Sequence, residues 1–133
     1  MTMRKKKEKQ KKEERFEPLN DKTAIPFFFV YAKKNPEKHV RIETQFGNID
    51  LELDPKKPYH RANFIFLIKN NYFDGTLFHR VVPGFIIQGG ASDNSKVMRK
   101  RRELGRYLIP VDAKPSDRHH RGVISMPSSE IDN

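Results

Sequence analysis

The stretch of sequence that decides the fold is Phe78-His-Arg-Val-Val-Pro-Gly-Phe-Ile-Ile-Gln-Gly-Gly90, a run of thirteen residues. It contains most of one short apolar segment, residues 77–82, and the whole of another, residues 85–88. Pro83-Gly84 lies between the two segments and forces a turn, because proline fixes φ and glycine tolerates conformations that other residues avoid. The run therefore predicts two short strands joined by a tight turn.

Upstream of this run, hydrophobic alternation predicts a second β-hairpin. Residues 40–44 (Val-Arg-Ile-Glu-Thr) and 49–53 (Ile-Asp-Leu-Glu-Leu) alternate apolar and polar side chains, as strands with one buried face do. Between them, Phe46-Gly-Asn48 contains two residues that tolerate positive φ and suit a turn. Two alternating segments around a short turn indicate an antiparallel pair.

The segment that follows has helical periodicity. From Pro58 to Asn71 the apolar residues follow the spacing of one helix face. This stripe consists of Ala62, Phe64, Ile65, Leu67 and Ile68. Residues 72–75 predict a turn, residues 91–107 are charged and are expected to form a loop, and residues 122–126 predict one more strand. Strands, one helix and further strands predict a mainly β fold, a β-barrel with flanking helices.

The positive charge of the chain lies in two segments. The 133 residues carry a net charge of +10. Residues 1–16 hold eight basic and three acidic residues, and residues 96–106 hold six basic and one acidic, so each segment contributes +5. Residues 4–15 contain no apolar residue to bury, which predicts disorder or a frayed helix. We expect residues 1–37 to form a basic, disordered N-terminal extension and residues 38–133 to form the folded domain.

Two functions stay open for the basic tail. It could act as a solubilising segment, or it could make weak, non-specific contacts with nucleic-acid phosphates. Residues 4–15 contain no aromatic side chain that could stack on a base. Any such binding is therefore expected to depend strongly on salt.

Composition excludes several other classes of function. The absence of cysteine excludes a disulfide framework, thiolate zinc sites and a thiol nucleophile. The longest apolar run, residues 24–32, contains a proline and is far shorter than the roughly 20 residues of a membrane-spanning helix. We expect a cytoplasmic protein without membrane contact. His119-His120 has no third ligand at a telling spacing, so neither a metal nor a cofactor is expected.

The run of residues 78–90 resembles the signature of the cyclophilin family of peptidyl-prolyl isomerases. The similarity extends upstream through residues 40–53, Asn63-Phe64 and residues 72–75, and more loosely downstream through residues 107–126. It implies a closed β-barrel with flanking helices. It also implies an enzyme of protein folding that accelerates cis/trans isomerisation of bonds preceding proline, with proline-containing peptides and unfolded proteins as partners and no cofactor.

The resemblance assigns roles to four residues of the signature. Arg80 corresponds to the catalytic donor. Phe85 and Ile86 correspond to positions that line the proline pocket, although many relatives have Met in place of Ile86. Gln88 corresponds to the amide that holds the substrate backbone, and it shares a strand face with Ile86. Ala91 stands where the family usually has an acidic residue.

The sequence ends at Asn133, before the part in which family members complete the pocket and close the barrel. The resemblance therefore implies a barrel that is incomplete at its C-terminus, with residues 38–133 matching about the first two-thirds of the family domain. A fragment of a longer chain, a truncated gene product and an inactive module that binds peptides without turnover all stay open. A basic accessory protein that binds nucleic acid through the tail and residues 96–106 is a further alternative.

Overall fold

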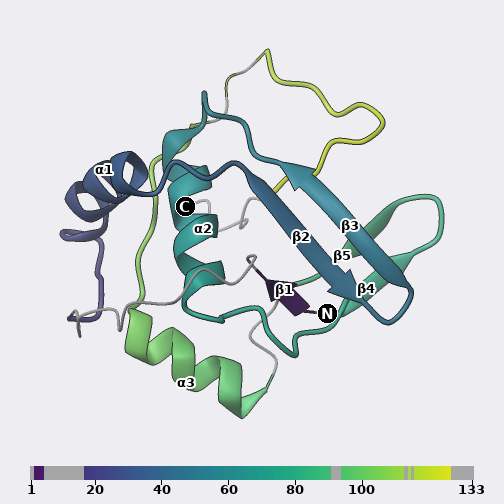
Figure 1. Cartoon of the computed structure of the whole chain (residues 1–133), viewed down its shortest axis with the longest axis horizontal. Helices are drawn as coiled ribbons and strands as arrows, with labels where there is room; N and C mark the ends of the chain where they lie inside the picture. The colour runs from purple at the N-terminus through teal and green to yellow at the C-terminus, as the bar shows by residue number, and fades with distance from the viewer. Residues whose placement is uncertain (1, 5–16, 91–93, 113, 115, 127–133) are drawn as a thin grey trace, which may run out of the picture.

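The computed structural model of the chain describes residues 2–4, 17–90, 94–112, 114 and 116–126. Its elements are β1 (Thr2–Arg4), α1 (Ala24–Lys34), β2 (His39–Thr44), β3 (Gly47–Glu52), α2 (Pro58–Lys69), β4 (Arg80–Val82), β5 (Ile86–Gln88) and α3 (Ser95–Leu104). Strands β1, β2 and β3 form one antiparallel sheet, and β4 and β5 form another. In the view of Figure 1, α2 lies between α1 and the β2–β3 strands.

The face of α2 that points toward the sheet carries the first hydrophobic cluster. Ile65 and Ile68 of α2 are 4% and 6% exposed, and they pack with Val40 and Ile42 of β2. Phe73, in the turn after α2, completes the cluster. The expected hairpin is confirmed, with six residues of β2 paired to six of β3, because its alternation places the apolar side chains of β2 against a helix.

A second face of α2 packs against the other two helices. Ala62 and Phe66 of α2 are fully or almost fully buried in a cluster with Phe28 of α1 and Leu104 of α3. The rings of Phe28 and Phe66 meet edge to face at 5.5 Å, an arrangement that adds to the energy of burial. The expected helix is confirmed, but the predicted stripe omitted Phe66, because α2 is buried on two sides and not on one.

The region before β2 differs from the disordered extension that the sequence led us to expect. Within residues 17–37, α1 is a regular helix whose Ala24 and Phe28 are completely buried. The expectation is wrong for this part because the aromatic run of α1 finds a packing partner in α2. The expectation is also wrong at residues 2–4, which form β1 and pair with β2. The prediction of disorder for residues 5–16 lies outside the described residues.

Arg61 of α2 joins α1 to the start of the sheet. Its guanidinium donates hydrogen bonds to the carbonyl oxygens of Ala32, Asn35 and Glu37, at 3.0, 2.7 and 3.1 Å. These carbonyls lie at the C-terminal end of α1 and in the connection to β2, where backbone acceptors have no helical partner. The Arg61 guanidinium therefore orders the connection between α1 and β2.

The structure also corrects the expected loop at residues 91–107. Residues 95–104 form α3, which begins where the Asn94 side chain accepts a hydrogen bond from the Val97 N–H at 3.0 Å, as an N-cap does. Val97 and Leu104 are 1% and 6% exposed. Because these two residues lie two turns apart, they anchor one face of a helix whose other positions are mostly charged.

The expected strand at residues 122–126 is wrong. Val123, Ile124 and Met126 are 43%, 64% and 55% exposed, and the segment pairs with no strand of the described residues. Within the same residues no closed barrel forms, and the barrel stays a prediction. In the described residues the helices (11, 12 and 10 residues) contain more residues than the strands (3, 6, 6, 3 and 3). This content differs from the mainly β fold that the sequence predicted.

Candidate active site

The signature stretch forms the β4–β5 hairpin, as its sequence predicts. The turn is closed by a hydrogen bond of 3.0 Å from the Phe85 N–H to the Val82 carbonyl. Pro83 occupies the second position, and Gly84 the third with φ of 72°, the pattern of a type II turn. A Cβ at Gly84 would meet no atom within 4 Å. The requirement for glycine is therefore conformational, and the turn sets the register of the two strands.

That register brings three of the predicted site residues to one face. Arg80 pairs with Gln88, and Val82 pairs with Ile86. Directly opposed residues of an antiparallel pair point to the same side, and residues two apart on one strand do likewise. Arg80, Ile86 and Gln88 therefore share a face, which we call the signature face.

Phe85 joins the same group from the turn. Its ring centroid lies 5.8 Å from the guanidinium carbon of Arg80, within the range of a cation–π interaction. This contact limits the conformations of an otherwise exposed arginine. All four residues that the sequence singled out are thus gathered on one small hairpin.

The signature face is an open surface and not an enclosed pocket. Phe85 is 74% exposed, and Arg80 is exposed, while Ile86 and Gln88 are half-buried. On the other side of the hairpin, Val81 and Ile87 are 60% and 68% exposed. In Figure 1 the β4–β5 hairpin extends outward from the body of the molecule. A bound peptide would therefore contact these side chains from the solvent side.

Asn63, one of the residues that carry the family resemblance, is buried inside the fold. Its side chain is 7% exposed and accepts a hydrogen bond of 2.6 Å from the Tyr107 hydroxyl. Burial, with a smaller contribution from Tyr72, raises the pKa of Tyr107 above its ordinary range, so this hydroxyl stays a donor at physiological pH. The pair fixes residue 107 to α2 and does not reach the signature face.

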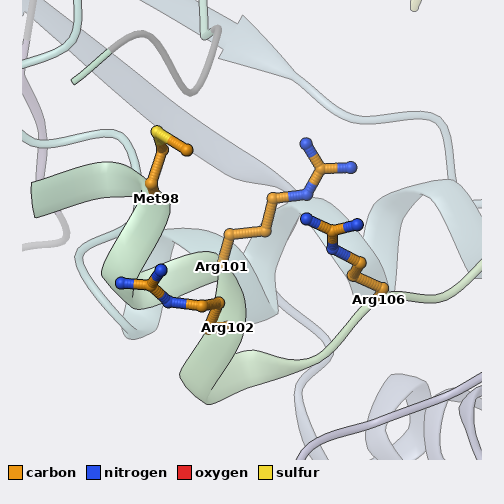
Figure 2. A pocket seen from close by; sticks show the side chains of 4 residues that line it. All are labelled: Met98, Arg101, Arg102 and Arg106. Carbon is orange, nitrogen blue, oxygen red and sulfur yellow. The ribbon is translucent and has the colours of Figure 1, made fainter. Parts of the chain in front are cut away.

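A second group of side chains, mostly basic, lies at α3 in an arrangement that the sequence did not predict. Figure 2 shows a small pocket of about 60 Å³ at α3, lined by Met98, Arg101, Arg102 and Arg106. Because residues 91–107 were expected to form a loop, their charges had no predicted arrangement. The signals for a helix were Asn94 as a capping residue and Val97 and Leu104 seven positions apart.

No metal centre or membrane span was found in the part of the chain that the structure describes. There, His, Cys, Asp and Glu side chains form no group of three or more placed to hold a metal ion. His119 and His120 are both exposed. No helix of these residues is long and apolar enough to cross a membrane.

Several proteins named as isomerases are similar to this chain. It is 49% identical over 106 residues to peptidyl-prolyl cis-trans isomerase CYP57 of Arabidopsis thaliana, covering 78% of this chain and 21% of that protein. It is 36% identical over 97 residues to peptidyl-prolyl cis-trans isomerase A of Dickeya dadantii, covering 71% and 49%. Peptidyl-prolyl cis-trans isomerase-like 2 of Rhizopus delemar is 37% identical over 100 residues, covering 74% and 18%.

The alignments with these three curated relatives span between 18% and 49% of the relatives' lengths. No solved structure matches the chain. The model of the family described as cyclophilin type peptidyl-prolyl cis-trans isomerase matches residues 39–133. That match covers most of the chain and includes the whole hairpin on which Arg80, Phe85, Ile86 and Gln88 lie. The chain therefore belongs to the cyclophilin-type peptidyl-prolyl cis-trans isomerase family.

Proposed function

We propose that this chain accelerates the cis/trans isomerisation of peptide bonds that precede proline, with Arg80 as its catalytic residue. The observation that carries the proposal is the grouping on the signature face, where Arg80 pairs with Gln88 and lies 5.8 Å from the Phe85 ring. Family membership supports the reaction type. The alternative of an inactive peptide-binding module rests on the same face and is separated by experiment below.

The reaction needs few chemical groups. Delocalisation of the nitrogen lone pair gives the peptide bond a rotational barrier of roughly 18–20 kcal/mol. Before proline the uncatalysed exchange takes tens to hundreds of seconds. A donor that engages the proline nitrogen as it becomes pyramidal weakens the delocalisation, and no covalent bond has to form or break. Every 1.36 kcal/mol taken from the barrier is worth about tenfold in rate.

Arg80 has the properties that such a donor requires. Its guanidinium is planar, stays charged throughout the physiological range and presents several N–H groups in a fixed fork. The Phe85 ring, 5.8 Å from the guanidinium carbon, favours conformations that keep this fork near Phe85. A donor that interacts more strongly with the twisted bond than with the planar one lowers the barrier to rotation.

The other three residues would hold the substrate. Phe85 and the half-buried Ile86 offer apolar surface to a pyrrolidine ring. Gln88 pairs with Arg80 across the hairpin, so its side-chain amide can hydrogen-bond the substrate backbone next to the donor. The substrate class that fits this face is a proline-containing peptide or an unfolded protein.

The remaining sequence-based expectations belong to the same proposal. A role in protein folding and a cytoplasmic location stay predictions, which refolding of a proline-limited client and localisation of a tagged chain would test. Weak nucleic-acid contact through the basic tail also stays a prediction, since residues 5–16 lie outside the described residues. Because β1 (Thr2–Arg4) pairs with β2, the test replaces the basic residues within 5–16 by glutamine and leaves β1 in place. This change should leave isomerase activity intact and remove whatever binding the tail contributes.

The decisive experiment compares two arginine variants. Cis-to-trans exchange of an Ala-Pro-Phe peptide is measured by exchange NMR with wild type, Arg80→Ala and Arg121→Ala, each shown to be folded by circular dichroism. Arg121 is exposed and no contact of its guanidinium is seen in the described residues, so it is a matched control for loss of one guanidinium. We expect acceleration by wild type and Arg121→Ala, and most of it lost in Arg80→Ala.

Two other outcomes would change the assignment. No acceleration by folded wild type, with chemical-shift changes showing that the peptide still binds, would make this chain an inactive binding module. Equal acceleration by Arg80→Ala and Arg121→Ala would contradict the role of Arg80 and leave the reaction without its proposed donor.

A further inference from the structure

The outward side of α3 carries a row of basic residues without acidic partners. Lys96, Arg99 and Arg102 are exposed and follow one another at intervals of three, which makes them neighbours along one helix face. Arg106, also exposed, follows directly after the helix and its cap. Within the residues that the structure describes, none of these four side chains lies in salt-bridge range of a carboxylate. We call them the α3 basic row.

Several basic residues elsewhere in the fold are paired with carboxylates. Arg41 lies 2.7 Å from Asp50, and Lys69 lies 2.8 Å from Glu37. Lys57 lies 2.9 Å from Asp117. Residues 96–106, in contrast, hold six basic and one acidic residue, half of the net charge of the whole chain. An uncompensated field therefore extends from α3 and attracts anions.

The C-terminal end of the row borders a small pocket, with the guanidinium of Arg102 turned to the other side of the helix (Figure 2). The pocket is lined by Met98, Arg101, Arg102 and Arg106. Its volume of about 60 Å³ is far smaller than the roughly 300–1,000 Å³ of pockets that enclose larger ligands. In the view of Figure 2 the guanidinium groups of Arg101 and Arg106 lie on the same side of the helix. Guanidinium groups bind phosphate oxygens in a bidentate manner.

The helix dipole alone does not account for this arrangement. The C-terminal end of a helix carries about half a negative charge, which favours nearby cations and opposes an anion. The exposed Arg102 and Arg106, with a full positive charge each, exceed that half charge about fourfold. The excess positive charge leaves a net attraction for an anion. Lys96 and Arg99 lie in the first half of α3, too far from its C-terminal end to interact with the negative end of the dipole.

The backbone around the pocket is fixed at several points. Leu19 donates a hydrogen bond of 2.8 Å to the Leu104 carbonyl, and a Cβ at Gly105 would lie only 2.0 Å from the Leu19 oxygen. On the other side of Arg106, the Tyr107 hydroxyl bonds Asn63 at 2.6 Å. Arg106 therefore projects from a backbone that is anchored before and after it, which lowers the cost of ordering it on a ligand.

We propose that the α3 basic row and its pocket bind the phosphate backbone of a nucleic acid, without reading its sequence. An α-helix of ten residues is about 15 Å long, and each strand of duplex DNA places one phosphate about every 3.4 Å along the helix axis, so the row spans several successive phosphates. An extended polyanion fits a row of four cations better than a single anion does. α3 contains no aromatic residue for stacking on bases.

The test uses the full chain and two triple variants of equal charge. The site variant is Arg99→Gln, Arg102→Gln and Arg106→Gln, and the control is Lys22→Gln, Lys34→Gln and Lys56→Gln, three exposed lysines on other elements. Fluorescence anisotropy with a labelled single-stranded DNA of mixed sequence is measured across a range of salt concentrations. The basic tail is present in every protein, so its contribution cancels.

We expect the site variant to bind at least about tenfold more weakly than the control. Each lost contact should also lower the slope of log K against log salt by about 0.7, giving a loss of about 2 for three contacts. Equal binding and equal slopes for the two variants would overturn the proposal. Competition by poly-glutamate as effective as by DNA of equal charge would overturn it in favour of an acidic protein partner. If the site variant does not fold, the single variant Arg102→Gln should still lower the slope by about 0.7.

Discussion

The β2–β3 and β4–β5 hairpins are both formed by short strands around a tight turn, but one is buried on one face and the other is exposed. In the β2–β3 hairpin, Val40 and Ile42 are 7% and 6% exposed because one face packs on α2. In the β4–β5 hairpin, Val81 and Ile87 are 60% and 68% exposed. Alternation around a short turn predicts the first hairpin, and the Pro83-Gly84 turn between two apolar segments predicts the second. The first contributes to the stability of the domain through burial, and we propose that the second presents side chains to a substrate.

The largest expected difference in stability is between substitutions of a buried and an exposed phenylalanine. Phe66 of α2 is 1% exposed, whereas Phe85 of the signature face is 74% exposed. Phe66→Ala should lower the free energy of unfolding by about 3–5 kcal/mol, the cost of removing a buried aromatic side chain. Phe85→Ala should change it by no more than about 0.5 kcal/mol, as surface substitutions do. Urea denaturation followed by circular dichroism measures both.

A large loss of stability for Phe85→Ala would contradict the comparison. It would mean that the signature hairpin is covered in solution, and that its exposure in the structure is not its working state.

A smaller effect is expected from a matched pair of isoleucines, one in each hairpin. Ile42→Val removes one methyl group from the core and should cost about 0.5–1.5 kcal/mol. Ile87→Val removes the same group from a side chain that is 68% exposed and should have almost no effect. The difference in midpoint of urea denaturation tests this directly, and equal shifts for the two variants would show that both hairpins pack alike.

The smallest effect concerns the exposed ion pair across the β2–β3 hairpin. The hydrogen bond from Arg41 holds the pKa of Asp50 below its ordinary value of 3.8. A carboxyl whose pKa is lowered by folding stabilises the fold above its unfolded pKa and loses that contribution as the pH falls through its folded pKa. Wild type should therefore be slightly more stable than Asp50→Asn at pH 7, and the difference should shrink below about pH 4.

Thermal melting of both proteins at pH 7 and pH 3 measures this difference. The same difference in Tm at the two pH values would show that the pair does not contribute through the charge of Asp50.

The elements that depend on local pattern could be predicted from the sequence. Alternation gave the β2–β3 hairpin, Pro83-Gly84 gave the turn of β4–β5, and helical spacing gave α2. The grouping of Arg80, Ile86 and Gln88 on one face follows from the register of that turn. The contact between Arg80 and the Phe85 ring does not follow from the pattern, because it depends on the positions of two side chains.

The elements that depend on distant partners could not be predicted. α1 was expected to be disordered because residues 1–37 were treated as one basic tail, and only the packing of Phe28 against Phe66 shows why it folds. The many charges of residues 96–106 favoured the prediction of a loop, whereas the buried Val97 and Leu104 anchor the α3 helix there. The expected strand at residues 122–126 had a suitable composition, but a strand forms only where another strand pairs with it.

The measurement that tests the central claim most directly is the ratio of two exchange rates. It compares the catalysed cis-to-trans exchange of an Ala-Pro-Phe peptide by wild type with that by Arg80→Ala, at equal concentrations of folded protein. We predict that wild type is faster by at least about tenfold, which corresponds to about 1.4 kcal/mol of barrier supplied by the Arg80 guanidinium on the signature face. A ratio of one would contradict the assignment of Arg80 as the catalytic residue.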